Sequence, residues 1–534
     1  MKTTRLTLYL MHSKVKKFED ALDRTKPMQK VDTNPSTGVD CNFYYAIPKH
    51  TVPAWSQFVQ PLLSKPLEGL SASSTAALLL VRSEERIFAL TFGYGRSLLN
   101  LAKIEYQFGL RVALNRIDPR QIRSLDTKTF EDLVVSTHTQ ASKSAELPTF
   151  GVDITRDILR SVTGEPRTDE FARRITGSDP LVMAAKTSAL ELPAVCTELL
   201  SAFHDNTYKQ DFGWIDQLSL VRKKESIEKL DACLVEQLRN GQCATTHLAI
   251  PETIGWENID GFRIRGTGQY VYEDLDIEEY LTRLDDKCKS IAIQKLKTRE
   301  VSVRYATSAQ FEKISSLYRC LVSEQRINGK LHVLIEGRWF SISSSLVGEV
   351  DAFVNRLPEM KELLPPALVS EHEKVYNARA AEMSNAKLLN LDAQVKRPGG
   401  ASSGIEFCDI LSDQGDLIHI KRKSRSSTLS HLFAQGSVSA STFINDGEFR
   451  DQIRELIKSR VADEVREKWL SLVPPAGSAV DRARYRVNYA VITSASDQGR
   501  DWLPFFSKLN LMQHARSLKT MGMEVAVSHI PVES

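Results

Sequence analysis

The sequence has few of the features that mark secreted, membrane-bound or nucleic-acid-coating proteins. Its seven cysteines are scattered, odd in number and never spaced as CxxC, which excludes a disulfide framework and a zinc knuckle and favours a reducing compartment. No apolar run approaches the roughly 20 residues that cross a bilayer. The formal net charge is only +3, so any binding site for nucleic acid must be a local patch. We expect a soluble, cytoplasmic protein with no membrane partner.

Signal, repeat and low-complexity segments are also missing. The N-terminal stretch MKTTRLTLYLMHSKVKK has a short apolar run, but charge returns at once and no small-residue cleavage site follows. It is predicted to be a first strand leading into a helix over SKVKKFEDALDR, and not a signal peptide. No internal repeat indicates a solenoid or propeller.

The length of 534 residues exceeds what one hydrophobic core supports, and about three domains are expected. A polar stretch at 136–151 and the break LPPALVS suggest the boundaries. We predict an N-terminal α+β domain over 1–145, a mixed, largely helical middle domain over 146–360 that ends in a hairpin, and an α/β domain over 361–534.

Hydrophobic periodicity gives the expected elements of the first two domains. AALLLVRSEERIFALTFG is typical of a hairpin with its turn at Ser83, Glu84 and Glu85, and GKLHVLIEGRWFSIS of a second hairpin. DPLVMAAKTSALELPAVCTELLSAF and ESIEKLDACLVEQLRN are typical of helices.

The C-terminal domain shows the clearest order of elements. A helix, EHEKVYNARAAEMSNAKL, leads through a basic loop to a hairpin over 405–421. The helical segments SSTLSHLFAQGSVSASTF and DGEFRDQIRELIKSRVADEVREKWL follow, and then the strand RVNYAVITS, the helix FFSKLNLMQHARSLKTMG and the strand MEVAVSHI. This alternation predicts an α/β fold.

The C-terminal hairpin is predicted to place three reactive side chains together. If Leu411 lies opposite Leu417, then Asp409 lies opposite His419, with Lys421 two residues further on. Side chains alternate across a sheet, so a carboxylate, an imidazole and an ammonium share one face. The opposite face is then apolar, with Ile410, Ile418 and Ile420.

Such a face suits cleavage of a phosphodiester. Asp409 and His419 are predicted to bind a divalent metal ion, Mg2+ or Mn2+, which polarises a phosphate and lowers the pKa of a bound water. Lys421 would orient that water or stabilise charge in the transition state. Glu373 in the preceding helix is predicted to be a further metal ligand or a supporting carboxylate, and Glu382 is a weaker candidate.

These residues resemble the PD-(D/E)xK nuclease superfamily, which has the restriction-endonuclease-like fold. The resemblance rests on Asp409, on His419-Ile420-Lys421, on Glu373 and on a following helix that contains Gln435, and it covers about residues 365–534. It implies a restriction-endonuclease-like α/β domain with metal-dependent nuclease activity. The acidic member of the motif is replaced by His419, a softer ligand that fits manganese better than magnesium.

The whole chain resembles a family of sporadically distributed bacterial proteins of about this length that carry a domain of unknown function. The segments FGYGRSLL, FGLRVALNRIDPRQIRSLD, EGRWFSI and IHIKRKSRSSTLSHLFAQGSVSA carry this resemblance. Patchy distribution among bacteria implies defence against phage or mobile elements.

Basic residues around the hairpin are predicted to neutralise nucleic-acid phosphates. They are Lys396 and Arg397 in the preceding loop, and Arg422, Lys423 and Arg425 after the second strand. A solvated charged edge that discourages strand aggregation explains the same residues. His431 and Gln435 stand at i and i+4 on the next helix, where they contact the substrate or have a structural role.

The leading hypothesis is a metal-dependent nuclease or a nuclease-derived effector. One alternative is an inactive nucleic-acid-binding sensor or scaffold with the same fold, and another is a component of a protein assembly. The choice between DNA and RNA, and the formation of a homo-oligomer, stay open.

Overall fold

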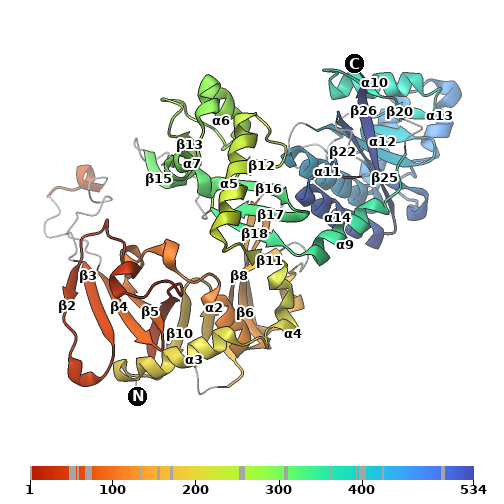
Figure 1. Cartoon of the computed structure of the whole chain (residues 1–534). Helices are drawn as coiled ribbons and strands as arrows, with labels where there is room; N and C mark the ends of the chain where they lie inside the picture. Colours follow the sequence, from red (N-terminus) through yellow and green to blue (C-terminus); the bar gives the residue numbers. More distant parts are fainter. Residues whose placement is uncertain are drawn as a thin grey trace. The chain divides into compact units, whose positions relative to one another are not determined.

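The computed structural model (Figure 1) describes most of the chain. The described residues are 3–46, 56, 59–65, 75–130, 134–152, 157–168, 172–251, 259–305, 311–360, 364–392, 394–395, 405–423, 426–494 and 500–533. The chain divides into two compact units, one formed by 1–128 with 136–215 and the other by 129–135 with 216–534. Both units combine helices and sheets, so the chain is a multidomain α+β protein.

A ten-stranded sheet dominates the first unit, and every strand pair described in it is antiparallel. Its order is β2-β3-β4-β5-β1-β10-β9-β8-β6-β7. The strands are β1 (Thr4–Leu10), β2 (Gln29–Val31), β3 (Cys41–Ala46), β4 (Ala76–Ser83), β5 (Arg86–Gly93), β6 (Ile117–Phe130), β7 (Val134–Ala145), β8 (Asp157–Pro166), β9 (Ile175–Gly177) and β10 (Leu181–Ala185). The sheet therefore continues beyond the boundary expected at residue 145.

The hairpin predicted between β4 and β5 is confirmed, since Ser83 pairs with Arg86 around the turn. The helix expected over SKVKKFEDALDR is wrong. Only a short 3-10 turn forms there, at Phe18–Ala21. The buried side chains are Val15, Phe18 and Ala21, and their spacing of three residues suits a 3-10 turn better than an α-helix.

The single helix expected at 179–203 is replaced by a strand and a shorter helix. Leu181, Met183 and Ala185 alternate as buried residues, which gives β10. A capping box between Ser188 and Glu191 then starts the helical turn that leads into α3 (Leu192–His204). Helices α2 (Phe108–Arg116) and α3 pack on each other and on this sheet.

Two antiparallel sheets form the first part of the second unit, so strands make up more of it than the helical patterns indicated. The larger has the order β11-β18-β17-β16-β12 and the smaller β13-β14-β15. The strands are β11 (Leu218–Leu220), β12 (Thr246–Leu248), β13 (Ile259–Ile264), β14 (Glu300–Tyr305), β15 (Phe311–Ser316), β16 (Leu321–Ile327), β17 (Lys330–Ile335) and β18 (Arg338–Ile342). The main helices are α5 (Lys224–Arg239), α6 (Ile277–Leu284), α7 (Ile293–Thr298) and α9 (Ser344–Asn355). The predicted β17–β18 hairpin is confirmed, with positive φ at Glu336 and Gly337.

A six-stranded sheet organises the C-terminal part, with the order β19-β26-β25-β24-β23-β20. The strands are β19 (Ala367–Leu368), β20 (Leu388–Asn390), β23 (Ile410–Ser412), β24 (Asp416–Arg422), β25 (Arg486–Thr493) and β26 (Glu524–Glu533). β24, β25 and β26 are parallel, whereas β20 and β23 pair antiparallel. The helices are α10 (Glu373–Met383), α11 (Ser426–Asn445), α12 (Gly447–Arg460), α13 (Asp463–Leu470) and α14 (Phe505–Thr520).

The predicted helices and strands of this part occur in the expected order, but the structure adds one helix and the strands β19, β20 and β21 (Gln394–Val395). The segment 446–470 is not one long helix, because the backbone becomes extended at Val461 and Ala462 between α12 and α13. Val461 is buried there, and Trp469 and Leu470 of α13 join the same core.

The two faces of the six-stranded sheet carry separate cores. Ile410, Ile418 and Ile420 pack with Tyr376 and Ala380 of α10, while the other face contributes to a larger core that includes residues of α11, α12 and α14. None of the helices in the described part of the chain combines the length and hydropathy that crossing a bilayer requires.

Candidate functional site

The predicted register of the C-terminal hairpin is confirmed. Leu411 pairs with Leu417 and Ile410 with Ile418. Beyond these pairs, the backbone N–H of Asp409 donates to the carbonyl of Ile418 at 3.0 Å. Gly415 has φ +90°, and a Cβ there would lie 2.7 Å from the carbonyl oxygen of Arg484. The turn therefore requires glycine and helps to fix the register.

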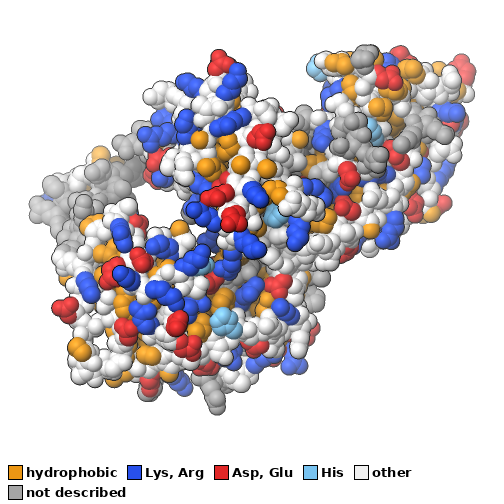
Figure 2. Space-filling model, viewed as in Figure 1, with side chains coloured by type: hydrophobic (Ala, Val, Ile, Leu, Met, Phe, Trp, Pro, Cys, Tyr) orange, Lys and Arg blue, Asp and Glu red, His pale blue; other side chains and the backbone are white. Residues whose placement is uncertain are grey.

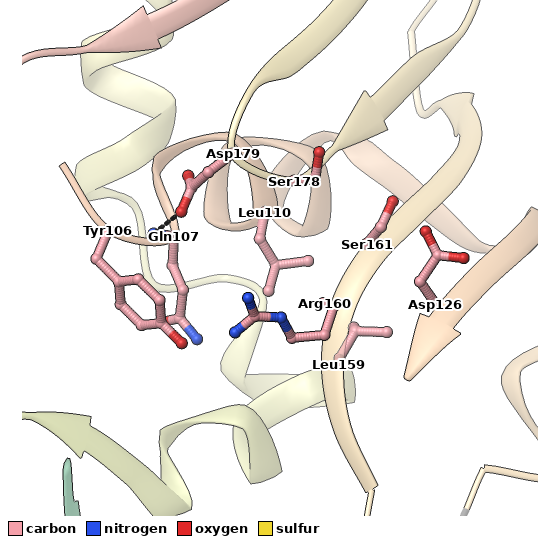
Figure 3. Close-up of a pocket in the computed structure, with 9 residues that line it drawn as sticks. All are labelled: Tyr106, Gln107, Leu110, Asp126, Leu159, Arg160, Ser161, Ser178 and Asp179. Atoms are coloured by element: carbon pink, nitrogen blue, oxygen red, sulfur yellow. Dashed lines mark hydrogen bonds between the residues drawn. The ribbon is translucent and has the colours of Figure 1, made fainter. Parts of the chain in front are cut away.

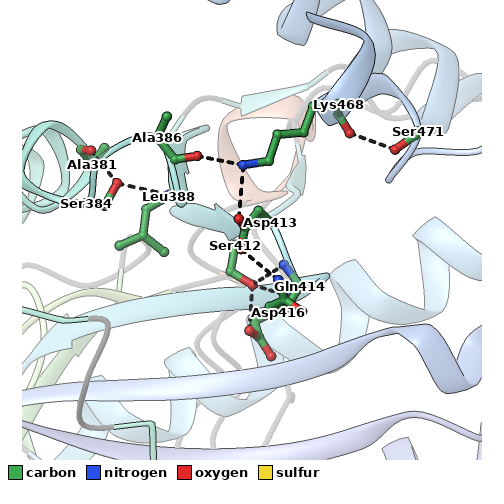
Figure 4. Close-up of polar contacts among 10 residues, drawn as sticks. All are labelled: Ala381, Ser384, Ala386, Leu388, Ser412, Asp413, Gln414, Asp416, Lys468 and Ser471. Atoms are coloured by element: carbon green, nitrogen blue, oxygen red, sulfur yellow. Dashed lines mark hydrogen bonds and ion pairs between the residues drawn. The ribbon is translucent and has the colours of Figure 1, made fainter. Parts of the chain in front are cut away.

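At the turn end of the hairpin, residues 412–416, side chains form several hydrogen bonds and ion pairs (Figure 4). Ser412 Oγ donates to Asp416 Oδ2 at 2.5 Å, and Arg486 Nε donates to Asp416 Oδ1 at 2.8 Å. Lys468 Nζ of α13 donates to Asp413 Oδ2 at 3.0 Å. Each carboxylate at this end faces a cation, so these residues have a structural role.

At the opposite end, Asp409 lies in a very different environment. Its partly buried carboxylate accepts a hydrogen bond from the backbone N–H of Ile420 at 2.7 Å. Burial raises the pKa of Asp409 to about 7, and the charges of Asp392, Glu406 and Glu373 add to the rise, while the hydrogen bond from Ile420 opposes it. Four carboxylates therefore interact electrostatically at this end of the hairpin.

The structure brings Glu373 and Lys421 together in an ion pair, whereas the sequence predicted Glu373 as a metal ligand or supporting carboxylate. Glu373 is the first residue of α10, and Lys421 lies near the end of β24. The Lys421 Nζ atom is 2.9 Å from Glu373 Oε2, and the two side chains are 31% and 32% exposed. The backbone N–H of Arg422 also donates to Glu373 Oε1 at 3.0 Å. This carboxylate–ammonium pair is accessible to solvent, and the charge of Glu373 contributes to the raised pKa of Asp409.

His419 does not share this accessible position. It is only 3% exposed, and its ring centroid lies 6.3 Å from that of Tyr489. The Tyr489 hydroxyl in turn donates to the carbonyl of Phe433 in α11 at 3.0 Å. Burial lowers the pKa of His419 to about 4, and Nε2 has no hydrogen-bond partner among the described residues. The face of β24 that carries this imidazole is therefore covered by α11.

The basic residues predicted to bind nucleic acid are held by carbonyl groups where the structure describes them. The Arg422 guanidinium donates to the carbonyls of Glu371 and Leu368 at 3.1 and 3.0 Å, and Lys423 Nζ donates to the Trp502 carbonyl at 2.6 Å. His431 is exposed on α11, and Glu382 is exposed on α10. Lys396, Arg397 and Arg425 lie outside the described residues.

Three polar residues near Asp409 were missed at the sequence level: Asn377, Asp392 and Glu406. Asn377 stands four residues after Glu373 on α10 and thus on the same helix face, which is the one signal that could have pointed to it. Glu406 Oε2 accepts from Gln435 Nε2 of α11 at 3.1 Å, which gives Gln435 a supporting contact. Asp392 follows β20 in a loop, where spacing carries no information about contacts.

A cavity of about 840 Å³ adjoins Glu373 and is lined by Ser370, Glu371, His372, Glu373, Lys374 and Arg422. It lies at the N-terminus of α10, where backbone N–H groups favour anions. The side chains of His372 and Lys374 are exposed there. The lining thus has two carboxylates, Glu371 and Glu373, together with the cations Lys374 and Arg422, and the cavity offers room for a phosphate group at the helix N-terminus.

A second cavity, of about 230 Å³, belongs to the first unit. In Figure 3 the Arg160 side chain lies in the middle of this pocket, with Tyr106 and Gln107 on one side of it and Ser161 and Asp126 on the other. The Asp179 carboxylate accepts a hydrogen bond from the backbone N–H of Gln107 at 3.0 Å. This lining mixes both signs of charge. Lys and Arg side chains are likewise interspersed with Asp and Glu over the face seen in Figure 2.

Within the described residues, no group of three His, Cys, Asp or Glu side chains is arranged to hold a metal ion. The donor set around Asp409 still fits a divalent cation in its chemistry. Its carboxylates carry more negative charge than Lys421 balances, and Asn377 adds a buried side-chain oxygen, Oδ1, that has no partner. Carboxylate and amide oxygens are ligands that Mg2+ and Mn2+ accept.

Comparison with known proteins gives a family but no individual relative. Residues 6–531 match the family described as Family of unknown function (DUF6119). No curated protein and no solved structure matches the chain.

Proposed function

The chain belongs to the family of unknown function DUF6119, and from the site at the end of its C-terminal hairpin we propose a metal-dependent nuclease or a nuclease-derived effector that acts on nucleic acid. The observation that carries the proposal is the placement, at one end of the hairpin, of Asp409, which accepts from the Ile420 N–H, and of the Glu373–Lys421 pair, whose carboxylate contributes to the raised pKa of Asp409. A carboxylate poised near neutral pH beside an accessible lysine suits phosphodiester chemistry.

The sheet that holds the site supports the proposal. Helix α10 is followed by β20, β23 and β24, then by α11 and, after two further helices, by β25, which lies parallel to β24. In this order of elements, Asp409 stands directly before β23, and His419 and Lys421 lie on β24, the places that the resemblance to the PD-(D/E)xK superfamily gives to the Asp and to the (D/E)xK motif. Glu373 from the first helix reaches the end of the third strand in this order.

Each residue has a defined task in the proposed reaction. The carboxylates around Asp409 would hold a divalent cation, which would polarise the phosphodiester and lower the pKa of a bound water. Lys421 stabilises negative charge that develops on the phosphate, because its side chain is 31% exposed and lies one residue after Ile420, whose N–H binds Asp409. Glu373 holds the ammonium of Lys421 in position through the 2.9 Å ion pair. The cavity beside Glu373 receives a phosphate of the substrate.

The test is cleavage of DNA and RNA by the purified chain with Mg2+ or Mn2+. Replacement of Lys421 by Ala is expected to lower the cleavage rate by about 100- to 1000-fold, the usual effect of removing one group that stabilises the transition state. Lys468→Ala is the matched control, because Lys468 also forms an ion pair in this domain but does so with Asp413 at the turn end (Figure 4). Cleavage that survives in Lys421→Ala would contradict the proposed role.

The second candidate is an inactive sensor or scaffold that binds nucleic acid through the same fold. It is favoured by the burial of His419, which stands where the superfamily has an acidic ligand. Binding whose affinity falls steeply with salt, without turnover under either metal, would select this alternative. For either version we propose a role in bacterial defence against phage or mobile elements, which rests on the resemblance stated from the sequence.

A further inference from the structure

The loop after β20 places Asp392 beside Asp409. The backbone N–H of Leu391 donates to the Asp409 carbonyl at 2.8 Å, so the two acidic residues lie on neighbouring stretches of chain. The backbone of Asp392 is fixed from both sides, since its N–H donates to Asn390 Oδ1 at 3.0 Å and its carbonyl accepts from Arg460 at 3.2 Å. This position is a built feature of the fold.

Asn377 approaches the same point from α10. It is 1% exposed, and its Nδ2 atom lies 3.4 Å from Asp392 Oδ2, so the side-chain amide is directed at the carboxylate. Its other amide atom, Oδ1, is buried and has no hydrogen-bond partner. Buried polar atoms are normally satisfied, and an unsatisfied carbonyl oxygen on an amide that contacts the Asp392 carboxylate matches the needs of a cation or of a water bound to it.

The charges around this oxygen are unbalanced. Among the described residues no Lys or Arg side chain forms an ion pair with Asp392, Glu406 or Asp409, and the nearby Lys421 ammonium is paired with Glu373. Carboxylates in mutual electrostatic range repel one another unless protons or a cation neutralise them. A bound cation would remove this repulsion and satisfy Asn377 at once.

We infer that Asp392 and the Asn377 side-chain carbonyl, together with Asp409, bind the divalent cation of the proposed nuclease site, so that oxygen donors take the place of the His419 imidazole. The inference rests on the proposed function and names its metal ligands. Two carboxylates and one carbonyl, completed by water, form a donor set suited to Mg2+ or Mn2+, which retain several waters in proteins. With these ligands His419 is a core residue packed on Tyr489.

The inference is tested by titrating Mn2+ alone into the full chain, with binding measured by calorimetry and by the electron paramagnetic resonance of the free ion. Asp392→Asn and Asn377→Leu are each expected to weaken Mn2+ binding by about 10- to 100-fold, the range found when metal-site interactions are lost. His419→Gln is expected to change the affinity less than about twofold. Asp413→Asn is the matched control, since it removes a carboxylate at the turn end of the same hairpin.

Thermal unfolding of each variant shows whether it folds, and a rise in the melting temperature of the unaltered chain with Mn2+ gives a second readout. Unchanged binding in both Asp392→Asn and Asn377→Leu, no binding by the unaltered chain, or loss of binding in His419→Gln would overturn the inference. Binding that depends on Asp392 without any cleavage of DNA or RNA would instead overturn the proposed nuclease and leave this inference standing. Cleavage that is insensitive to Asp392 and Asn377 would do the reverse.

Discussion

The two ends of the C-terminal hairpin differ in whether their carboxylates are paired with cations. At the turn end, Asp413 faces Lys468 and Asp416 faces Arg486 at 3.0 and 2.8 Å. At the other end, Asp409 lies among further carboxylates and a single paired lysine. The two ion pairs connect the turn to Lys468 of α13 and to Arg486 of β25. An excess of carboxylates lowers the stability of the folded chain, and such a loss is typical of sites that bind a ligand.

The pKa values express the same contrast. Burial tends to raise the pKa of Asp413, but hydrogen bonds from Lys468 and Gln414 and the charge of Lys468 lower it overall. For Asp409, burial and the neighbouring carboxylates raise the pKa to about 7. The pKa values of two aspartates four residues apart on one hairpin are thus shifted in opposite directions. The direction of the shift distinguishes Asp413, a structural carboxylate, from Asp409, a candidate functional one.

The largest effect on activity is expected from a substitution at the end of the hairpin that carries Asp409. Asp409→Asn is expected to lower Mn2+-dependent cleavage by at least about 100-fold, because the carboxylate is a proposed metal ligand. The free energy of unfolding in the absence of metal should stay the same or rise, because one of several repelling carboxylates is lost. Cleavage rates and urea denaturation measure the two quantities. A variant that is inactive because it is unfolded would weaken the contrast between the two ends.

The opposite outcome is expected at the turn end. Asp416→Ala leaves the Arg486 guanidinium without its carboxylate and removes the partner of the fully buried Ser412 hydroxyl. The free energy of unfolding is expected to fall by about 2–4 kcal/mol, with Mn2+ affinity unchanged. Urea denaturation followed by circular dichroism measures the loss, and an effect below 1 kcal/mol would show that the turn contacts are dispensable.

Stability and Mn2+ affinity are both expected to change with pH through the ionisation of Asp409. Because the pKa of Asp409 is raised from 3.8 to about 7, the folded chain holds a proton between about pH 4 and pH 7 that the unfolded chain releases. The contribution of Asp409 to the free energy of unfolding therefore falls as the pH rises through this window. Since Mn2+ competes with the proton, Mn2+ affinity should weaken by up to about 10-fold per pH unit below pH 7.

Calorimetric titration at several pH values from 8 to 6 measures this change in affinity. A flat profile in the unaltered chain would mean that Asp409 is ionised throughout and that its charge is balanced after all. Asp413 has the opposite sign: its lowered pKa gives stability that is present above 3.8 and is lost as the pH falls further. Asp413→Asn should therefore leave the Mn2+ profile between pH 8 and pH 6 unchanged.

The smallest effect is expected for Lys468→Ala. The Lys468 side chain is 44% exposed, and exposed ion pairs contribute about 0.2–1 kcal/mol. The substitution also removes the exposed hydrogen bond from Lys468 Nζ to the Ala386 carbonyl at 2.9 Å, so we expect a loss at the upper end of this range. Urea denaturation should show a change of this size, and a larger loss would indicate that Lys468 anchors α13 to the hairpin more firmly than its exposure suggests.

Local patterns predicted much of the hairpin and of its surroundings. Alternation and the turn at Asp413-Gln414-Gly415 gave the correct pairing of Leu411 with Leu417, because the period of a strand and the length of its turn leave little freedom. The presence of Glu373 in the helix before the hairpin also followed from the pattern, but its ion pair with Lys421 did not. Patterns over longer segments were less reliable, since the segment 446–470 breaks at Val461, where burial in the core interrupts a strong helical pattern.

The sequence by itself determined which side chains share a face of each strand and which elements follow one another, because these depend on backbone periodicity and on neighbours in the chain. The packing of distant segments sets two features that the sequence left open: α11 and Tyr489 cover the His419 face, and Asn377 contacts Asp392, whose charge acts on Asp409. Contacts of this kind depend on how distant segments pack, and the burial that shifts the pKa values of Asp409 and His419 in opposite directions arises only when they do.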